Sequence, residues 1–297
     1  MRNIKSEKII KQKLSNNKYA FNSTRSIYKI YCNIFGKFHS LPDFLIIGAK
    51  KSGTTSLYRY LSMHPNVQSS ATKEIGFFDR YFEKGENWYR MNFPSKGNQN
   101  EENSDRFKKI TGEATPTYIY HPHAPKRVSK LLKNIKLIVI LRNPIDRAYS
   151  QYNMEANNNN NEKLTFEEAI EQEPERLEGE FEKMKNDENY FSNNYHTFSY
   201  ITSSIYADQL ERWFKYFPRE QFLIINGDEL KKDSNGIYKK TLNFLKLSEY
   251  KLEKYEAVGK RKYPSMKPET RENLVEFFKP HNKRLYELLG IDFGWDK

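Results

Sequence analysis

A short apolar run followed by a glycine-containing polar loop is the feature that most constrains this chain. Residues 44–47, Phe-Leu-Ile-Ile, suit a buried strand, and the residues from Thr54 onward suit a helix. Between them lies the loop Gly-Ala-Lys-Lys-Ser-Gly. The first turn of a helix presents unpaired N–H groups and the positive end of the helix dipole, so this unit predicts an anion site suited to phosphate.

The positions of the loop lysines argue against magnesium-dependent phosphoryl transfer. In a Walker A loop the lysine follows the second glycine, and the next Ser or Thr holds magnesium. Here Thr54 follows Gly53, and Lys50 and Lys51 come before it. A P-loop kinase or nucleotide triphosphatase is therefore disfavoured, although magnesium-dependent ATP hydrolysis would revive it.

A second strand-loop-helix unit ends in arginine. Residues 136–141, Lys-Leu-Ile-Val-Ile-Leu, suit another buried strand, and Pro144 suits the first turn of the next helix. Arg142 directly follows the strand, at the edge where ligands bind in open α/β sheets. A guanidinium can bind phosphate bidentately. A surface ion pair with Asp146 is the alternative interpretation.

The two units resemble those of sulfotransferases that use PAPS, 3'-phosphoadenosine 5'-phosphosulfate. In that family the 5'-phosphosulfate loop reads lysine, a small residue, then Gly-Thr-Thr. The resemblance implies that the 5' group is bound by Lys51, Ser52, Gly53, Thr54, Thr55 and Ser56. The family's 3'-phosphate motif, an Arg after the strand and a Ser eight residues later, matches Arg142 and Ser150. Lys50 is expected to tolerate substitution better than Lys51.

A further segment is similar to the heparan sulfate N- and 3-O-sulfotransferases more than to the cytosolic phenol and steroid group. Residues 73–79, Lys-Glu-Ile-Gly-Phe-Phe-Asp, carry this resemblance, which makes Glu74 the general base. A carboxylate can take the proton that leaves an acceptor hydroxyl or amine. Lys51 would stabilise the charge on the leaving phosphate. Without the resemblance, Glu74 and Lys73 would be interpreted as a solvated charge pair.

The resemblance implies a glycan-type acceptor, including an anionic glycan, and a small-molecule sulfotransferase is the alternative. If Glu74 is not the base, Glu113 and His196 are the next candidates. Residues 259–264 resemble a basic loop that covers the cofactor phosphates, which makes Lys260 and Arg261 predicted ligands; a flexible surface loop is the alternative. The predicted donor is PAPS, the product is PAP, and no His or Cys set has metal-ligand spacing.

The expected fold is α/β, with a P-loop NTPase-like central parallel sheet of about five strands flanked by helices. Residues 222–225 suit another strand, and residues 267–290 suit a long amphipathic helix. We expect a basic N-terminal extension over residues 1–40 and a sulfotransferase domain over residues 41–297. The formal net charge of +12 raises the possibility of nucleic-acid binding, but that function gives no reason for the loop chemistry, so no nucleic-acid partner is predicted.

The amino-terminal region predicts no membrane span. Its least polar part, residues 27–38, is interrupted by Lys29, Asn33 and Lys37, and it lacks a signal-peptide core. A single cysteine, Cys32, excludes an internal disulfide and favours a reducing, cytoplasmic location. Residues 157–161 should form a loop, and the acidic residues 162–189 should form helices with solvated faces.

Overall fold

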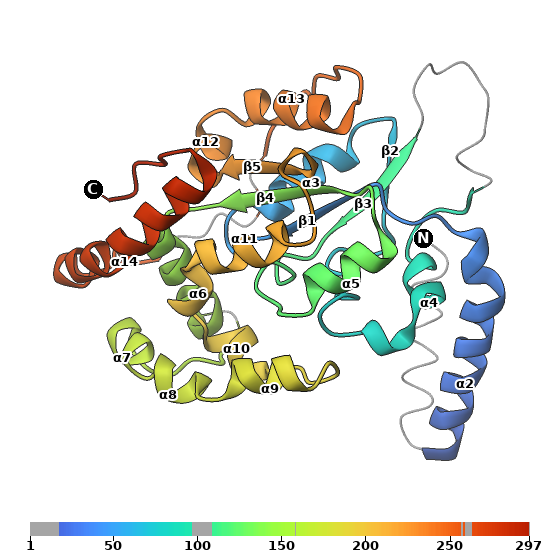
Figure 1. The fold of residues 1–297 in the computed structure, drawn as a ribbon, viewed down its shortest axis with the longest axis horizontal. Helices are drawn as coiled ribbons and strands as arrows, with labels where there is room; N and C mark the ends of the chain where they lie inside the picture. The colour runs from blue at the N-terminus through green and yellow to red at the C-terminus, as the bar shows by residue number, and fades with distance from the viewer. Residues whose placement is uncertain (1–17, 97–108, 158, 257, 259–262, 297) are drawn as a thin grey trace.

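Five parallel strands form the central sheet of the computed structural model, which describes residues 18–96, 109–157, 159–256, 258 and 263–296 (Figure 1). The strands are β1 (Phe44–Gly48), β2 (Val67–Ser69), β3 (Ile110–Ala114), β4 (Lys136–Leu141) and β5 (Phe222–Asn226). They lie in the order β2-β3-β1-β4-β5, and every neighbouring pair is parallel. The predicted P-loop-like α/β sheet is therefore confirmed.

Helices connect the strands and cover both faces of the sheet (Figure 1). In chain order they are α2 (Lys18–Phe35), α3 (Thr54–Ser62), α4 (Glu86–Arg90), α5 (Ala124–Leu131), α6 (Pro144–Asn157), α7 (Phe166–Glu171), α8 (Glu173–Leu177), α9 (Glu180–Asn186), α10 (Asn193–Phe198), α11 (Tyr206–Phe214), α12 (Gly227–Lys232), α13 (Ser234–Leu245) and α14 (Pro268–Leu289). The helices predicted to begin at Thr54, near Pro144 and near residue 267 are all present.

Strand β1 and the part of β4 after Lys136 consist of buried apolar residues and Gly48, as expected for strands that are covered on both faces. Successive side chains of a strand point to opposite faces, so β1 supplies two cores. Leu45 and Ile47 pack with residues of α5, α11 and α14. Phe44 and Ile46 pack with residues of α3, α12 and α13. This double covering fixes the sheet between two helical layers.

The order of the strands places a crevice at the ends of β1 and β4. From β1 the chain crosses to β2 and β3 on one side of the sheet, and it later reaches β4 and β5 on the other side. In α/β sheets such a switch point, at the carboxyl ends of the strands, is where ligands bind. Gly48 of β1 lies beside Val139 of β4, so the loops that follow these two strands are neighbours.

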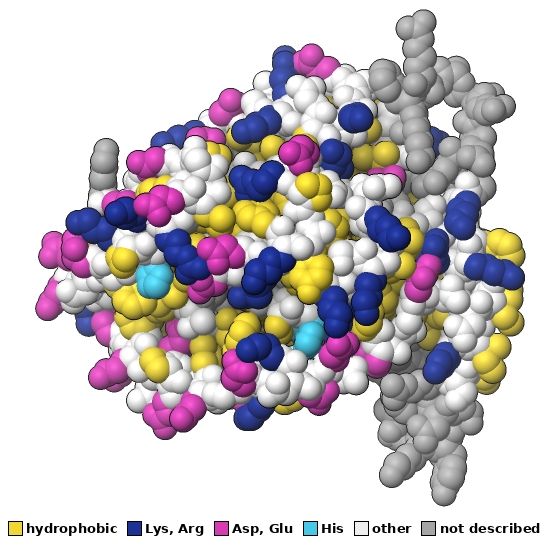
Figure 2. Space-filling view, viewed as in Figure 1, with side chains coloured by type: hydrophobic (Ala, Val, Ile, Leu, Met, Phe, Trp, Pro, Cys, Tyr) yellow, Lys and Arg dark blue, Asp and Glu magenta, His cyan; other side chains and the backbone are white. Residues whose placement is uncertain are grey.

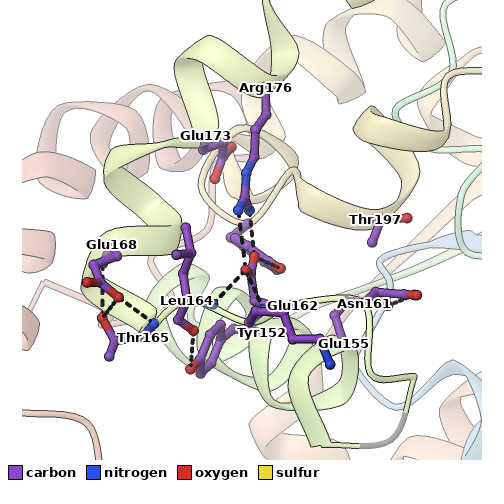
Figure 3. A network of polar contacts seen from close by, with 12 residues as sticks. Tyr152, Glu155, Asn161, Glu162, Leu164, Thr165, Glu168, Glu173, Arg176 and Thr197 are labelled. Carbon is purple, nitrogen blue, oxygen red and sulfur yellow. Dashed lines mark hydrogen bonds and ion pairs between the residues drawn. The ribbon is translucent and has the colours of Figure 1, made fainter.

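The acidic segment after α6 differs from the prediction. Glu162, Glu173 and Glu180 are buried rather than solvated. Glu162 accepts a hydrogen bond from Arg176 Nη1 at 2.5 Å (Figure 3). It also accepts one from Tyr200 Oη at 3.0 Å. Glu173 accepts hydrogen bonds from the backbone N–H groups of residues 201 and 202, and Glu180 accepts one from the Tyr190 hydroxyl. Each of these buried carboxylates has hydrogen-bond donors from the protein in place of water. The three glutamates therefore connect the segments of the α7–α10 region to one another.

Helix α2 packs beside α4 at one end of the molecule (Figure 1). Its buried Cys32 is a free thiol. Within the described residues, no helix combines the length and the apolar character needed to cross a membrane. The proposed boundary between residues 40 and 41 stays a prediction.

Candidate active site

The predicted phosphate loop lies between β1 and α3, at the carboxyl edge of the sheet. Its backbone is tied to the neighbouring strand, because Ala49 N donates to Ile140 O at 2.7 Å. Gly53 has a φ of 106°, a left-handed conformation that residues with side chains rarely adopt. As the N-cap of α3, Gly53 has no side chain to bind the first-turn N–H groups. The helix start can therefore offer those N–H groups to an anion.

The loop also has a support that sequence reasoning missed. Gly227, the first residue of α12, lies so close to the loop that a Cβ atom there would be 2.7 Å from Ser52 O and 3.0 Å from Leu141 O. Only glycine fits this contact without a shift of the backbone. The start of α12 thus fixes the loops after both β1 and β4, and nothing in the local sequence around Gly227 indicates this role.

Arg142 reaches the phosphate loop from the end of β4. Its Nη1 donates to Lys51 O at 3.2 Å, and its own carbonyl accepts from Tyr206 Oη at 2.9 Å. Among the described residues, Arg142 Nε is buried and has no hydrogen-bond partner. The alternative partner, Asp146, pairs with Arg271 instead. A buried cationic donor without an acceptor fits an anionic group of a ligand.

A cavity of about 360 Å³ lies beside Arg142 and is lined by residues that include Tyr149 and Tyr263. Ser150 follows Tyr149 on α6 and is 8% exposed, and its pairing with Arg142 on a 3'-phosphate stays a prediction.

Lys260 and Arg261 lie outside the described residues. Neighbours on both sides of them do reach the site. Val258 N donates to Ser56 Oγ at 3.0 Å, and Tyr149 Oη donates to Pro264 O at 2.9 Å.

Glu74 lies between β2 and α4, next to the end of β3. Its N–H donates to Ala114 O at 3.2 Å, and its φ of 60° is uncommon for a residue with a side chain. The carboxylate is 52% exposed and pairs with Lys73, as a surface ion pair would. Burial lowers the pKa of Lys50, and the charge of Glu74 is among the groups that oppose this. Glu74 thus lies at the carboxyl end of β3, at the same edge of the sheet as the loop after β1, and its role as base stays a prediction.

Glu113 is a fully buried carboxyl group on β3. Its Oε1 accepts from Tyr89 Oη at 2.7 Å and from Tyr118 Oη at 3.0 Å, while its Oε2 accepts from Thr115 Oγ1 at 2.7 Å. Desolvation raises the pKa of Glu113 to about 7, although the three donors favour the charged form. The Glu113 side chain has no exposed surface in this structure, which argues against it as the alternative base.

The same network holds the segment that carries Glu74. Thr115 Oγ1 accepts from Gly76 N at 3.3 Å, and Tyr118 Oη accepts from Phe77 N at 2.9 Å. Both of these hydroxyl groups donate to Glu113 in turn. Glu113 is therefore a positioning residue, which acts through Thr115 and Tyr118 on the backbone two and three residues after Glu74.

Lys50, which was expected to tolerate substitution better than Lys51, has a structural role that its place in the motif did not indicate. Its Nζ donates to Glu155 Oε1 at 3.2 Å and to His196 O at 3.1 Å. Glu155 is 2% exposed and also accepts hydrogen bonds from Asn159 Nδ2 at 2.7 Å and Asn161 Nδ2 at 2.9 Å. Figure 3 labels Glu155 and Asn161. The phosphate loop is thus joined to α6 by a buried ion pair. Burial lowers the pKa of His196 to about 3, which makes its ring a weak proton acceptor.

Comparison with known proteins identifies a match to the sulfotransferase domain family over residues 41–284. The heparan sulfate glucosamine 3-O-sulfotransferase 3B1 of Mus musculus is 32% identical, and the match covers 86% of this chain and 65% of that protein. The 3-O-sulfotransferase 5 of Mus musculus is 32% identical, covering 86% and 74%. The membrane-associated sulfotransferase kil1 of Dictyostelium discoideum is 27% identical, covering 88% and 68%. The chain thus spans 65% to 74% of the length of these relatives.

A solved structure agrees with the sequence relatives. The crystal structure of a sulfotransferase from Alicyclobacillus acidocaldarius matches with a TM-score of 0.67 and 29% identity, covering 87% of this chain and 100% of that one. The family match begins before β1 and ends within α14, so it includes both strand-loop-helix units and Glu74. The resemblance seen in the motifs is confirmed, and this chain belongs to the sulfotransferase family.

Proposed function

We propose that this protein transfers a sulfuryl group from PAPS to a hydroxyl or amine of a glycan-type acceptor. The observation that carries the proposal is a pair of neighbouring groups suited to anions, at the ends of β1 and β4. One site is the start of α3, and the other is Arg142, whose Nε is buried without a partner among the described residues. PAPS carries phosphate groups at two separate positions of its nucleoside, which suits two separate sites.

The residues that would hold the donor follow from this arrangement. The helix start and loop, residues 51–56, would bind the 5'-phosphosulfate, and Arg142 with Ser150 would bind the 3'-phosphate. Lys260 and Arg261 would add positive charge to the same phosphates. Arg142 fits a bound phosphate because its Nε is a buried donor without an acceptor among the described residues. Its contact with the carbonyl of Lys51 in the phosphate loop distinguishes it from Arg127 and Arg212, whose Nε atoms also have no partner there.

When bound, PAPS supplies an activated sulfuryl group and PAP is the leaving product. Glu74 would accept the proton that the acceptor loses, and its half-exposed carboxylate can reach a substrate in solvent. Lys51 would place a positive charge beside the leaving phosphate and so stabilise the charge that develops in the transition state. Glu113 would keep the Glu74 segment in place through Thr115 and Tyr118.

The glycan class of acceptor is supported by the relatives, two of which are named heparan sulfate glucosamine 3-O-sulfotransferases. The net charge of +12 favours association with an anionic partner, including an anionic glycan. Phenols and other small molecules are the alternative acceptors. A screen of desulfated polysaccharides, oligosaccharides and phenols with labelled PAPS separates the two classes, because transfer to phenols alone would favour the alternative.

Calorimetry with PAP tests the donor site without any acceptor. The wild-type protein should bind PAP more tightly than adenosine 5'-phosphate, which lacks the 3'-phosphate. Arg142→Ala should weaken PAP binding by about 1.5–3 kcal/mol, the usual contribution of a hydrogen bond to a charged group. It should weaken adenosine 5'-phosphate binding less, because only the hydrogen bond from Arg142 Nη1 to Lys51 O connects Arg142 to the 5' site.

Arg59→Ala is the matched control, since Arg59 is a half-exposed arginine on α3 that pairs with Glu256. It should leave PAP affinity unchanged. Equal affinity for the two nucleotides, or an Arg142→Ala variant that binds PAP normally, would contradict the proposal.

A further inference from the structure

The outer side of α2 carries a stripe of apolar side chains. Of the thirteen large hydrophobic side chains that are exposed in the described part of the chain, seven lie between positions 27 and 38. Ile27 (65% exposed), Ile30 (58%), Tyr31 (46%) and Ile34 (50%) form the stripe itself. Tyr28 (44%) and Phe35 (44%) flank it toward Cys32, and Phe38 (56%) follows in the 3₁₀ turn Gly36–Phe38. The spacing of Ile27, Ile30, Tyr31 and Ile34 places them on one helix face. Figure 2 shows hydrophobic side chains along the outer edge of this helix.

The opposite side of the helix holds it against the protein. Cys32 is 2% exposed, and Gly36, just after the helix, is also buried. A Cβ atom on Gly36 would lie 2.3 Å from Asn87 O of α4, so the two elements touch at the backbone. This contact fixes the orientation of α2, and the stripe faces away from the body of the protein.

Positive charge accompanies the stripe. Residues 18–38 contain four Lys or Arg and no Asp or Glu, and residues 1–40 contain nine Lys or Arg and one Glu. Lys29 and Lys37 are exposed, and Lys37 Nζ lies 5.1 Å from the centre of the Phe38 ring. A helix with its side chains is roughly 10–12 Å across, which is about one Debye length. Charges on the helix therefore still attract negative charge at a surface that its apolar side contacts. A binding partner that matches both features has an apolar interior and a negatively charged surface.

We propose that α2 binds the surface of an anionic lipid membrane, with its apolar stripe at the boundary of headgroups and acyl chains. Helices that lie in this plane combine an apolar face with basic residues and are too polar to span the bilayer. Lys29 and Asn33, which lie between the apolar residues in the sequence, make this segment too polar to span the bilayer. Anionic lipids attract such basic segments, and these lipids are found in the cytoplasmic leaflet of membranes.

Two other occupants fit the stripe less well. A second copy of the chain would bring two basic helices together, and neither helix has an acidic residue to neutralise the other. A soluble polyanion would meet the lysines but would leave seven apolar side chains in water. A membrane surface satisfies both features at once.

The orientation that follows leaves the active site accessible. Strands β4 and β5 run away from the end of the molecule where α2 lies (Figure 1). Their carboxyl ends, which carry the Arg142 site, therefore point away from the bound surface. A protein docked through α2 would hold its candidate active site toward the aqueous phase.

Sedimentation of the full chain with lipid vesicles tests the proposal. We expect binding to vesicles of phosphatidylcholine with phosphatidylserine, little binding to phosphatidylcholine alone, and release by salt. Ile30→Asp with Ile34→Asp should lower the vesicle affinity at least about tenfold for each side chain removed from the interface. Lys29→Glu with Lys37→Glu should lower it roughly fivefold or more per lysine.

Ile291→Asp is the matched control, because Ile291 is 44% exposed and lies outside α2. It should bind vesicles as the wild type does, and circular dichroism should report the same helix content for all variants. Failure to sediment with anionic vesicles, or equal binding by the Ile30/Ile34 variant, would overturn the proposal. A concentration-dependent dimer in ultracentrifugation that the same variant abolishes would assign the stripe to self-association instead.

Discussion

Replacing Glu113 with Gln should flatten the dependence of folding stability on pH. In the folded protein burial raises the pKa of Glu113 from 4.5 to about 7. Between these values the folded protein keeps a proton that the unfolded chain has lost, so the free energy of unfolding falls as the pH rises. The stabilisation is complete below pH 4.5 and is lost as the pH passes 7. From pH 5 to pH 8 the loss should be about 2–3 kcal/mol, since each pKa unit corresponds to roughly 1.4 kcal/mol.

Gln is the appropriate replacement because the hydrogen bonds around Glu113 allow it. Both tyrosine hydroxyls, of Tyr89 and Tyr118, donate to the same oxygen, Oε1. An amide oxygen at that position can accept both bonds. The amide nitrogen would then donate to Thr115 Oγ1, which reverses one bond and removes the charge. The variant should therefore fold and should be the more stable protein at pH 8.

Urea unfolding at several pH values from 5 to 8 measures the effect. The quantity of interest is the difference in unfolding free energy between wild type and variant, because burial also raises the pKa of Asp79. The difference removes the part of the Asp79 contribution that does not depend on the charge of Glu113. Glu287→Gln, at an exposed glutamate of α14, is the control and should leave the pH dependence unchanged. Parallel pH profiles for wild type and Glu113→Gln would refute the reasoning.

Three further substitutions separate binding, chemistry and folding. Lys51→Ala should lower kcat far more than it weakens PAP binding, as kinetics and calorimetry together would report; equal losses would contradict a transition-state role. Glu74→Gln should lower kcat by roughly 10² to 10⁴ with unchanged PAP affinity. If the variant instead works at the wild-type rate across neutral pH, Glu74 is only the ion-pair partner of Lys73 and not the base. Lys50→Met should destabilise the fold by about 3 kcal/mol in urea unfolding, because it leaves Glu155 buried without its cation; a loss within experimental error would contradict this.

The strands and main helices were predictable because their signals are local. Residues 44–47 and 136–141 are almost uninterrupted apolar runs, and the structure places β1 and β4 over the same positions. Polar or proline residues mark the starts of α3 and α6, at Thr54 and Pro144. The parallel arrangement followed from the alternation of strands with helices, which requires crossovers.

The supporting contacts of the site could not be predicted, because their members lie far apart in the sequence. Lys50 and Glu155 are 105 positions apart, and neither has a local pattern that indicates burial. An acidic residue in a charged run is usually solvated, so the buried Glu162 was unexpected; its partner Arg176 lies two helices later. The roles of Glu74 and Lys51 came from family resemblance and, like the cytoplasmic location, stay predictions.

Transfer of label from radioactive PAPS to a desulfated heparan-type polysaccharide is the most direct test of the proposed function. The wild-type protein should move the label to the glycan without added magnesium, forming one PAP for each sulfate transferred, and Glu74→Gln should do so at a rate lower by roughly 10² or more. Label that stays on the nucleotide with every glycan acceptor, while ATP is hydrolysed in the presence of magnesium, would contradict the proposal.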